Sequence, residues 1–387
     1  MISPNRKQLK SLATRHRTPL YIYSRQYLEQ GAEELLNLCR PHGITARYAV
    51  KANPHHDIIK LFLDKGLQFD ASSEYEVENL INNGVPASVI SLSSQQPPRG
   101  LAMMLESDVR FVATSLHQLD LVSESGWQGN LAVRINPGVG TGHNKRTTTA
   151  GRTASFGIWH EYLPQILDWQ HKSGCVIDRL HIHAGSGGDP AVWESLIDAG
   201  LTLVGKMPSV TKFDIGGGFK VARLPNEQAA DMPRIMELFA QKMADFKDNT
   251  GRTIKLEIEP GSWLVANAGV LLAEVIDIVN TGPGGYEFLK LNTGMNDILR
   301  PAMYGAQHPI EVINDSKNQR QYVVVGHNCE SGDLLTPAAG DPETLGPRLL
   351  NEARIGDLVS IGAAGAYCAS MRAAGYNSFP AAAEIVV

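Results

Sequence analysis

The 387-residue sequence predicts a (β/α)8 TIM barrel followed by a mainly β C-terminal domain. Between residues 46 and 260, short β-rich runs alternate with amphipathic segments, and many of these runs end in ionisable residues. After Gly261 the pattern changes to strands separated by turns. A chain of this length exceeds what one hydrophobic core usually supports, so we expect two domains.

The barrel prediction rests on eight runs that are typical of buried strands. They are Ala46–Lys51, Leu67–Asp70, Val89–Leu92, Arg110–Ala113, Leu131–Ile135, Arg179–His183, Lys212–Ile215 and Ile254–Glu259. Intervening stretches such as Asp57–Lys65, Glu74–Asn83 and Met232–Asp248 have helical periodicity. Strand–helix alternation favours right-handed parallel units, and eight of these can close into a barrel.

The C-terminal third has the strand and turn signals of a β domain. Its apolar runs are Gly269–Val279, Phe288–Leu291, Gln321–Val325 and Asp357–Ile361, with turn residues rather than long helices between them. We place the barrel at residues 26–262 and the β domain at residues 263–387. The early run Leu20–Tyr23, within residues 1–25, is expected to pair with the β domain.

Composition excludes several classes of protein. The net charge is −5 and no basic run is present, so nucleic acid is not an expected partner. The longest apolar stretch, Trp263–Val279, contains Asn267, Glu274 and Asp277, which favours a buried strand over a membrane span. No secretory signal is expected. The four cysteines are scattered without metal-ligand spacing, so we expect a reduced, cytoplasmic protein without a metal site.

Ionisable residues gather at the C-terminal ends of the predicted strands. They are Lys51, Asp70, Arg134, His181, His183, Asp214, Glu257 and Glu259. Each one alone is equally consistent with a strand that emerges into water. As a set they predict an active site, because a barrel places its chemistry at this rim.

Four of these strand ends carry specific chemistry. Lys51 closes an apolar run, where a poorly solvated amine becomes the nucleophile that Schiff-base chemistry needs, although a solvated lysine explains it equally when taken alone. Gly216–Gly218 and the second glycine-rich exit, His183–Gly188 with Ser186, suit a phosphate, or are simply tight turns. Glu259, followed by Pro260 and Gly261, is placed to pair with a cationic ring nitrogen.

Cys329–Asp333 forms a polar loop after the run that ends at Val325. An exposed thiol in such a loop is a candidate proton donor, whereas a lone cysteine is more often inert.

The ordered set of motifs resembles the fold type III pyridoxal-phosphate decarboxylases over nearly the whole chain. The segments Arg300–Gly305, Cys329–Asp333 and Tyr376–Ser378 are most similar to the diaminopimelate decarboxylase branch. The resemblance implies pyridoxal 5'-phosphate as cofactor and an amino acid as substrate. It also implies a homodimer with shared active sites.

The resemblance implies a role for each matching residue. Lys51 would form the Schiff base and Cys329 would return a proton to the substrate carbon. The cofactor would be bound by Asp70, His183, Ser186, Gly216, Gly217, Gly218, Glu259, Gly261, Ser262 and Tyr367. The substrate would be bound by Arg300, Tyr304, Glu330 and Asp333.

One departure bears on the substrate. Ser262 follows Glu-Pro-Gly where the family usually has arginine, which removes a charge-assisted contact worth about 1.5–3 kcal/mol. Ser155 likewise stands where a lysine is common. Two substrates therefore stay open: meso-diaminopimelate, giving L-lysine, or a modified diamino acid such as a citryl-diaminopropionate siderophore intermediate, which we favour. A catalytically dead homologue that acts as a binding partner and an amino-acid racemase are alternatives, but retention of Lys51, Glu259 and Cys329 argues against the former.

Overall fold

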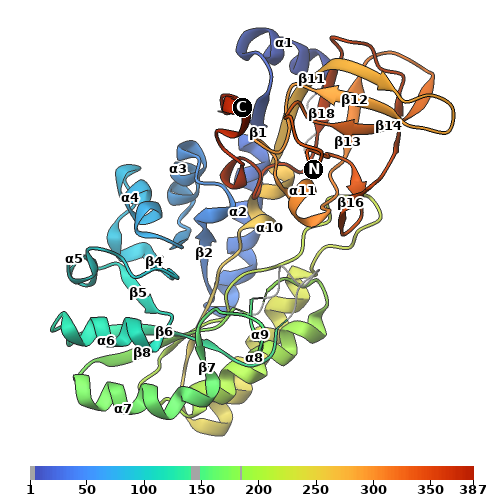
Figure 1. The fold of residues 1–387 in the computed structure, drawn as a ribbon. Helices are drawn as coiled ribbons and strands as arrows, with labels where there is room; N and C mark the ends of the chain where they lie inside the picture. Colours follow the sequence, from blue (N-terminus) through green and yellow to red (C-terminus); the bar gives the residue numbers. More distant parts are fainter. Residues whose placement is uncertain (1–4, 141–148, 184) are drawn as a thin grey trace. The chain divides into compact units, whose positions relative to one another are not determined.

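The computed structural model describes residues 5–140, 149–183 and 185–387 (Figure 1). The chain divides into two compact units. One comprises Met1–Leu28, Val221–Glu227 and Ser262–Val387, and is called the β unit below. The other, the barrel unit, comprises Glu29–Lys220 and Gln228–Gly261. Sequence analysis placed Val221–Glu227 in the barrel, whereas in the structure this short segment belongs to the β unit.

The barrel unit is a closed ring of parallel strands, which confirms the predicted fold class. The ring strands are β2 (Thr45–Ala49), β3 (Gln68–Ala71), β4 (Ile90–Leu92), β5 (Arg110–Ala113), β6 (Asn130–Asn136), β8 (Val176–His181), β9 (Lys212–Asp214) and β10 (Lys255–Ile258). They pair in chain order, and β10 pairs with β2 to close the ring. The two-residue strand β7 (Ile158–Trp159) pairs with β6 outside the ring.

A helix precedes the first ring strand, and helices follow most of the ring strands. They are α2 (Arg25–Cys39), α3 (His56–Lys65), α4 (Glu74–Asn82), α5 (Leu101–Glu106), α6 (Leu116–Glu124), α7 (Leu163–Ser173), α8 (Pro190–Gly205) and α9 (Met232–Thr250). Their ends follow ordinary capping chemistry. The Ser73 and Ser115 side chains accept backbone N–H groups at the starts of α4 and α6, and Gly66 and Gly251 end α3 and α9.

The β unit is built around the long strand β11 (Gly269–Asn280), which pairs antiparallel with β1 (Leu20–Tyr23) as expected. The other strands of this sheet are β12 (Glu287–Leu291), β13 (Ile310–Ile313), β14 (Gln319–Val325), β17 (Arg348–Asn351), β18 (Leu358–Ile361) and β19 (Ala383–Val386). A separate hairpin joins β15 (Pro337–Ala338) to β16 (Asp341–Leu345). The remaining helices, α1 (Arg6–His16), α10 (Ser262–Val265) and α11 (Arg300–Tyr304), are short.

The barrel interior contains charged side chains as well as the usual aliphatic ones. Arg47, Asp70, Arg179, Asp214 and Glu257 are all at most 7% exposed. Buried charges persist only when they are paired, so this interior is organised by ion pairs. Among the described helices, none is long and apolar enough to cross a membrane.

Candidate active site

Lys51 was predicted to be the last residue of a strand, but it lies two residues beyond the end of that strand. Strand β2 ends at Ala49, and Lys51 occupies a single 3-10 turn, Val50–Ala52. Its Nζ donates hydrogen bonds to Asp70 Oδ2 at 2.9 Å and to Ser72 Oγ at 3.2 Å. The Asp70 side chain is 1% exposed and that of Lys51 is 40% exposed. A buried carboxylate therefore holds an amine that an incoming molecule can reach.

The two glycine-rich strand exits lie side by side, as their predicted shared role requires. Gly187 N donates to Gly218 O at 3.0 Å, and Lys220 N donates to Gly187 O at 3.2 Å. Gly218 has a φ of +106°, and a Cβ there would overlap the carbonyl oxygen of Gly185. Only glycine fits this close approach of two backbones. Ser186 lies between Gly185 and Gly187 in the first of these two loops.

The Gly216–Gly218 loop is fixed by the residues around it. Asp214, the last residue of β9, accepts a hydrogen bond from Gly216 N at 2.8 Å. Gly217 N donates to His183 Nδ1 at 3.2 Å. Burial lowers the pKa of His183 well below its ordinary value, and the positive charges of Arg134 and Lys51 lower it further. His183 is therefore a neutral ring, with Nδ1 as acceptor and the proton on Nε2.

Glu259 is a buried carboxylate with unused bonding capacity. Its Oε2 lies 3.4 Å from His181 Nε2, and its Oε1 is buried without a hydrogen-bond partner among the described residues. Burial and, after it, the nearby charge of Asp70 raise the pKa of Glu259 to about 7, while the charge of Lys51 opposes the shift. Such a group is ready to accept a proton or to pair with a cation.

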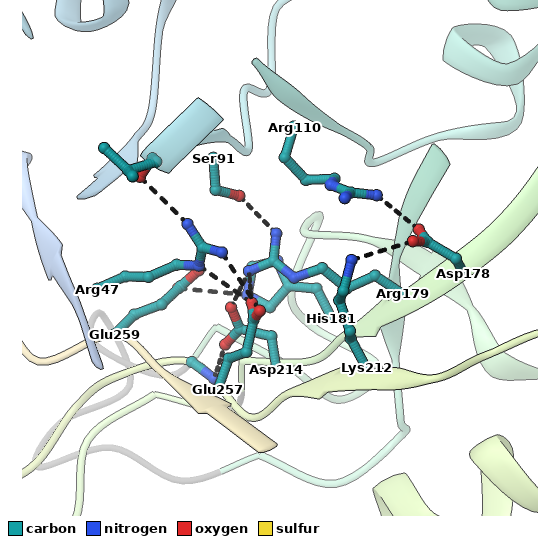
Figure 2. A network of polar contacts seen from close by, with 12 residues as sticks. Arg47, Ser91, Arg110, Asp178, Arg179, His181, Lys212, Asp214, Glu257 and Glu259 are labelled. Carbon is teal, nitrogen blue, oxygen red and sulfur yellow. Dashed lines mark hydrogen bonds and ion pairs between the residues drawn. The ribbon is translucent and has the colours of Figure 1, made fainter. Parts of the chain in front are cut away.

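A network of ion pairs behind Glu259 holds Asp214 in place (Figure 2). The fully buried Arg179 contacts both Asp214 and Glu257, and its Nη1 donates to Ser91 Oγ at 2.6 Å. Arg47 reaches Glu257 from the opposite side at 3.0 Å. Removing one partner from such a network would leave an uncompensated buried charge.

Sequence analysis missed Arg47 and Arg179. The available signal was an arginine within a buried strand, in β2 and in β8. Ser72, the second partner of Lys51, was also missed, since nothing local distinguishes it from a loop serine.

In the β unit, the Cys329–Asp333 loop is fixed from two sides. Asp333 accepts hydrogen bonds from Met295 N at 2.6 Å and from Asn328 N at 2.8 Å. Cys329 N donates to Asn377 Oδ1 at 2.7 Å, while the Cys329 residue itself is exposed. Asp333 is 3% exposed, so its contacts support a role in shaping the loop that presents the thiol.

Glu330 lies on the same loop and is exposed. It accepts hydrogen bonds from Gly332 N at 3.1 Å and from the Tyr376 hydroxyl at 3.2 Å. These bonds, led by that from Gly332, lower the pKa of Glu330. An exposed, ionised carboxylate suits the predicted recognition of a substrate amine.

The remaining predicted residues take the following positions. Arg300 and Tyr304 are the first and last residues of α11, and Ser262 is the first residue of α10. Tyr367 has a φ of +55°, a left-handed conformation that a side-chain-bearing residue adopts mainly where function or packing requires it. Gly261 lies in the barrel unit, where a Cβ would stand 3.1 Å from that of Ala52, beside the Lys51 turn.

The barrel region of the chain matches a known family. Residues 29–266 match the family model for the pyridoxal-binding domain of pyridoxal-dependent decarboxylases. The chain belongs to this family. This decarboxylase is 33% identical to diaminopimelate decarboxylase of Streptomyces coelicolor, over 98% of this chain and 87% of that protein. It is 30% identical to the Escherichia coli K12 diaminopimelate decarboxylase, over 95% and 88% of the two chains.

Solved structures show the same fold. A diaminopimelate decarboxylase crystal structure matches with a TM-score of 0.91 and 28% identity, covering 99% of this chain and 91% of that one. The diaminopimelate decarboxylase of M. jannaschii in complex with L-lysine matches with a TM-score of 0.86 and 25% identity, covering 97% and 88%. The decarboxylase is thus similar over almost its full length to carboxy-lyases of this group.

Proposed function

We propose that this decarboxylase binds pyridoxal phosphate through Lys51 and removes carbon dioxide from a diamino acid. The observation that carries the proposal is the Lys51–Asp70 pair, at 2.9 Å, in the same barrel interior as the half-satisfied Glu259. The donor set fits the cofactor. It offers a reachable amine for the aldehyde, a close-packed glycine backbone without Cβ atoms for the phosphate, and a buried carboxylate for the ring nitrogen.

Each barrel residue then has a defined task. Asp70 and Ser72 hold the Lys51 Nζ at the site. Gly216–Gly218, with Ser186, would bind the phosphate, and Glu259 would pair with the ring nitrogen. The neutral His183 ring, held by Gly217 N at 3.2 Å, would pack against the cofactor. When bound, the cofactor supplies an electron sink for the carboxylate's departure.

Residues of the β unit would complete the reaction. The exposed Cys329 thiol would deliver a proton from Sγ to the substrate carbon after carbon dioxide leaves. Glu330 would hold a substrate amine, while Arg300 and Tyr304 would hold the substrate's far end. As in the family that the sequence resembles, Cys329 and Glu330 would act across the interface of a homodimer. Analytical ultracentrifugation of the purified protein tests the dimer.

For the substrate, we propose a diamino acid with a modified far end, of the citryl-diaminopropionate type. Ser262 supports it, because a short neutral side chain follows Glu-Pro-Gly and leaves space for a larger distal group. The second candidate is meso-diaminopimelate, which is favoured by the names of the relatives at 30–33% identity.

The deciding experiment measures carbon dioxide release by the purified protein, loaded with pyridoxal phosphate, from a panel of diamino acids that includes both candidates. Lys51→Ala protein is the control for background release. Release from one candidate identifies the substrate. Interconversion of enantiomers without carbon dioxide would instead show a racemase. Cofactor binding without turnover of any panel member would support a binding protein.

A further inference from the structure

Two arginines of the β unit carry guanidinium groups that make no ion pair with any described residue. Arg223 lies in the short segment Val221–Glu227, and Arg300 begins α11. Neither guanidinium forms a hydrogen bond or an ion pair with a described residue, and the Nε of each is buried. Each residue is only partly buried, so the side chain stays accessible to a ligand, while its Nε has lost its hydration without a replacement partner among the described residues.

The two charges act on each other. Burial lowers the pKa of Arg223 to about 10, and the largest contribution after burial comes from Arg300. The carboxylate of Glu227, which opposes this shift, is already engaged: it accepts hydrogen bonds from Arg223 N at 2.7 Å and from Leu224 N at 3.3 Å. Glu227 thus offsets part of the charge of Arg223 but forms no ion pair with either guanidinium.

A third group completes the surroundings without adding negative charge. His308 is buried, and its Nδ1 lies 3.0 Å from Gly362 O. Burial, followed by the charges of Arg300 and Arg223, lowers the pKa of His308 to about 3, so the ring is neutral. Its Nε2 is buried without a hydrogen-bond partner in the part of the chain that the structure describes. Two guanidinium cations near a neutral imidazole, neither of them bonded to a carboxylate of a described residue, are suited to bind an anion.

We propose that Arg223 and Arg300 together bind an oxyanion, a carboxylate or a phosphate, with Arg223 as a specificity-determining residue of this decarboxylase. Arg300 alone was predicted to bind substrate from the resemblance, whereas Arg223 carries no such prediction. The identity of this oxyanion rests on the proposed function. Under that function, it is either a carboxylate at the substrate's far end or the cofactor phosphate. A substrate with several carboxylates, as in a citryl group, would make fullest use of two guanidinium groups.

The test measures anion binding directly, so it does not depend on turnover. Citrate is titrated by calorimetry into protein whose cofactor has been fixed by borohydride reduction, which leaves only the substrate source free to bind. In a second arm, pyridoxal phosphate is titrated into apoprotein and followed by absorbance. Both arms use wild type, Arg223→Gln and Arg223→Lys. Arg354→Gln is the matched control, because it removes an exposed arginine of the same unit.

Loss of one charge-assisted contact should weaken binding about tenfold or more. We expect Arg223→Gln to weaken citrate binding by that factor, with Arg223→Lys intermediate and Arg354→Gln unchanged. The same loss confined to pyridoxal phosphate would assign the site to the cofactor phosphate. Equal affinity of wild type and folded Arg223→Gln protein for both ligands, with folding checked by circular dichroism, would overturn the proposal. A decarboxylase inactive on every diamino acid but with Arg223-dependent anion binding would refute the proposed function alone.

Discussion

The Asp70 carboxylate holds the Lys51 amine at 2.9 Å although the two side chains differ sharply in exposure, at 1% and 40%. Asp70 comes from β3 and Lys51 follows β2, so the parallel pairing of these two strands sets their distance. The barrel thus presents an amine to solvent from a rigid, buried anchor. Precise placement of this kind is what covalent catalysis requires.

Replacing Asp70 by asparagine should weaken formation of the covalent link to Lys51 about tenfold or more, because a charge-assisted hydrogen bond is lost. Ser72→Ala, which removes the neutral contact at 3.2 Å, should have a smaller effect. Absorbance titration with pyridoxal phosphate measures both. Wild-type behaviour of Asp70→Asn would show that the amine is positioned by other groups.

The buried pair Asp214 and Glu259 predicts an unusual pH dependence of apoprotein stability. Burial raises the pKa of each carboxyl group to about 7, from ordinary values of 3.8 and 4.5. The folded state therefore holds protons that the unfolded chain has released. The stabilisation from this source is complete at low pH and is lost as pH rises from about 4.5 through 7. Because the groups interact, they titrate as a pair.

Urea unfolding of the apoprotein between pH 5 and 8 checks this. In wild type, one such proton contributes a decrease of at most about 1.4 kcal/mol per pH unit in the free energy of unfolding. Glu259→Gln should flatten the curve, whereas Glu124→Gln, which removes an exposed carboxylate on α6, should not. Parallel curves for wild type and Glu259→Gln would mean that Glu259 is ionised throughout.

The eight ring strands could be predicted because each lies in or beside a short run rich in apolar residues between turns or helices, although β8 begins at Val176, three residues before the predicted run Arg179–His183. The end of β2 could not, because the apolar run continues into Val50 while strand pairing stops at Ala49. Where pairing stops depends on neighbouring strands, and no local residue records it. The strands β13, β17 and β19 were missed because each combines a charged residue with only two or three apolar ones and leaves one residue exposed.

Candidate site residues could be proposed from the sequence where they lie at strand ends, but contacts that depend on pairing across the barrel could not be foreseen. Arg179 and Asp214 are 35 positions apart, and they meet only because β8 and β9 are neighbours. Arg223 was missed because a single arginine in a loop is ordinarily a solvated surface residue. Only the absence of a partner for its guanidinium among the described residues distinguishes it.

Cys329→Ala should reduce amine formation about a hundredfold or more, the usual contribution of a general acid, while cofactor binding is unchanged. The Cys329 thiol is exposed, and Cys329 is not among the residues that we assign to the cofactor. Ser331→Ala, on the same loop, is the control. Steady-state product analysis measures the effect, and full activity of Cys329→Ala would leave another group as the proton donor.

Ser262→Arg should raise turnover of meso-diaminopimelate about tenfold relative to wild type, since a guanidinium can make a charge-assisted contact that a serine cannot. The kcat/KM values for this substrate, measured with cofactor absorbance as a control for retained binding, test it. Efficient diaminopimelate decarboxylation by the wild type would instead show that serine is compatible with the unmodified substrate.

The assignment of Lys51 as the cofactor-bearing residue underlies all of these expectations, and one measurement tests it directly. Protein incubated with pyridoxal phosphate is reduced with borohydride, digested, and mapped by mass spectrometry. Lys220 is the most informative alternative lysine, because its side chain would lie 3.4 Å from a Cβ at Gly188, in the glycine-rich loop after His183. We expect a phosphopyridoxyl group on Lys51 that is absent in Lys51→Ala and retained in Lys220→Ala. Labelling of another lysine in wild type, or a reducible adduct that survives Lys51→Ala, would contradict it.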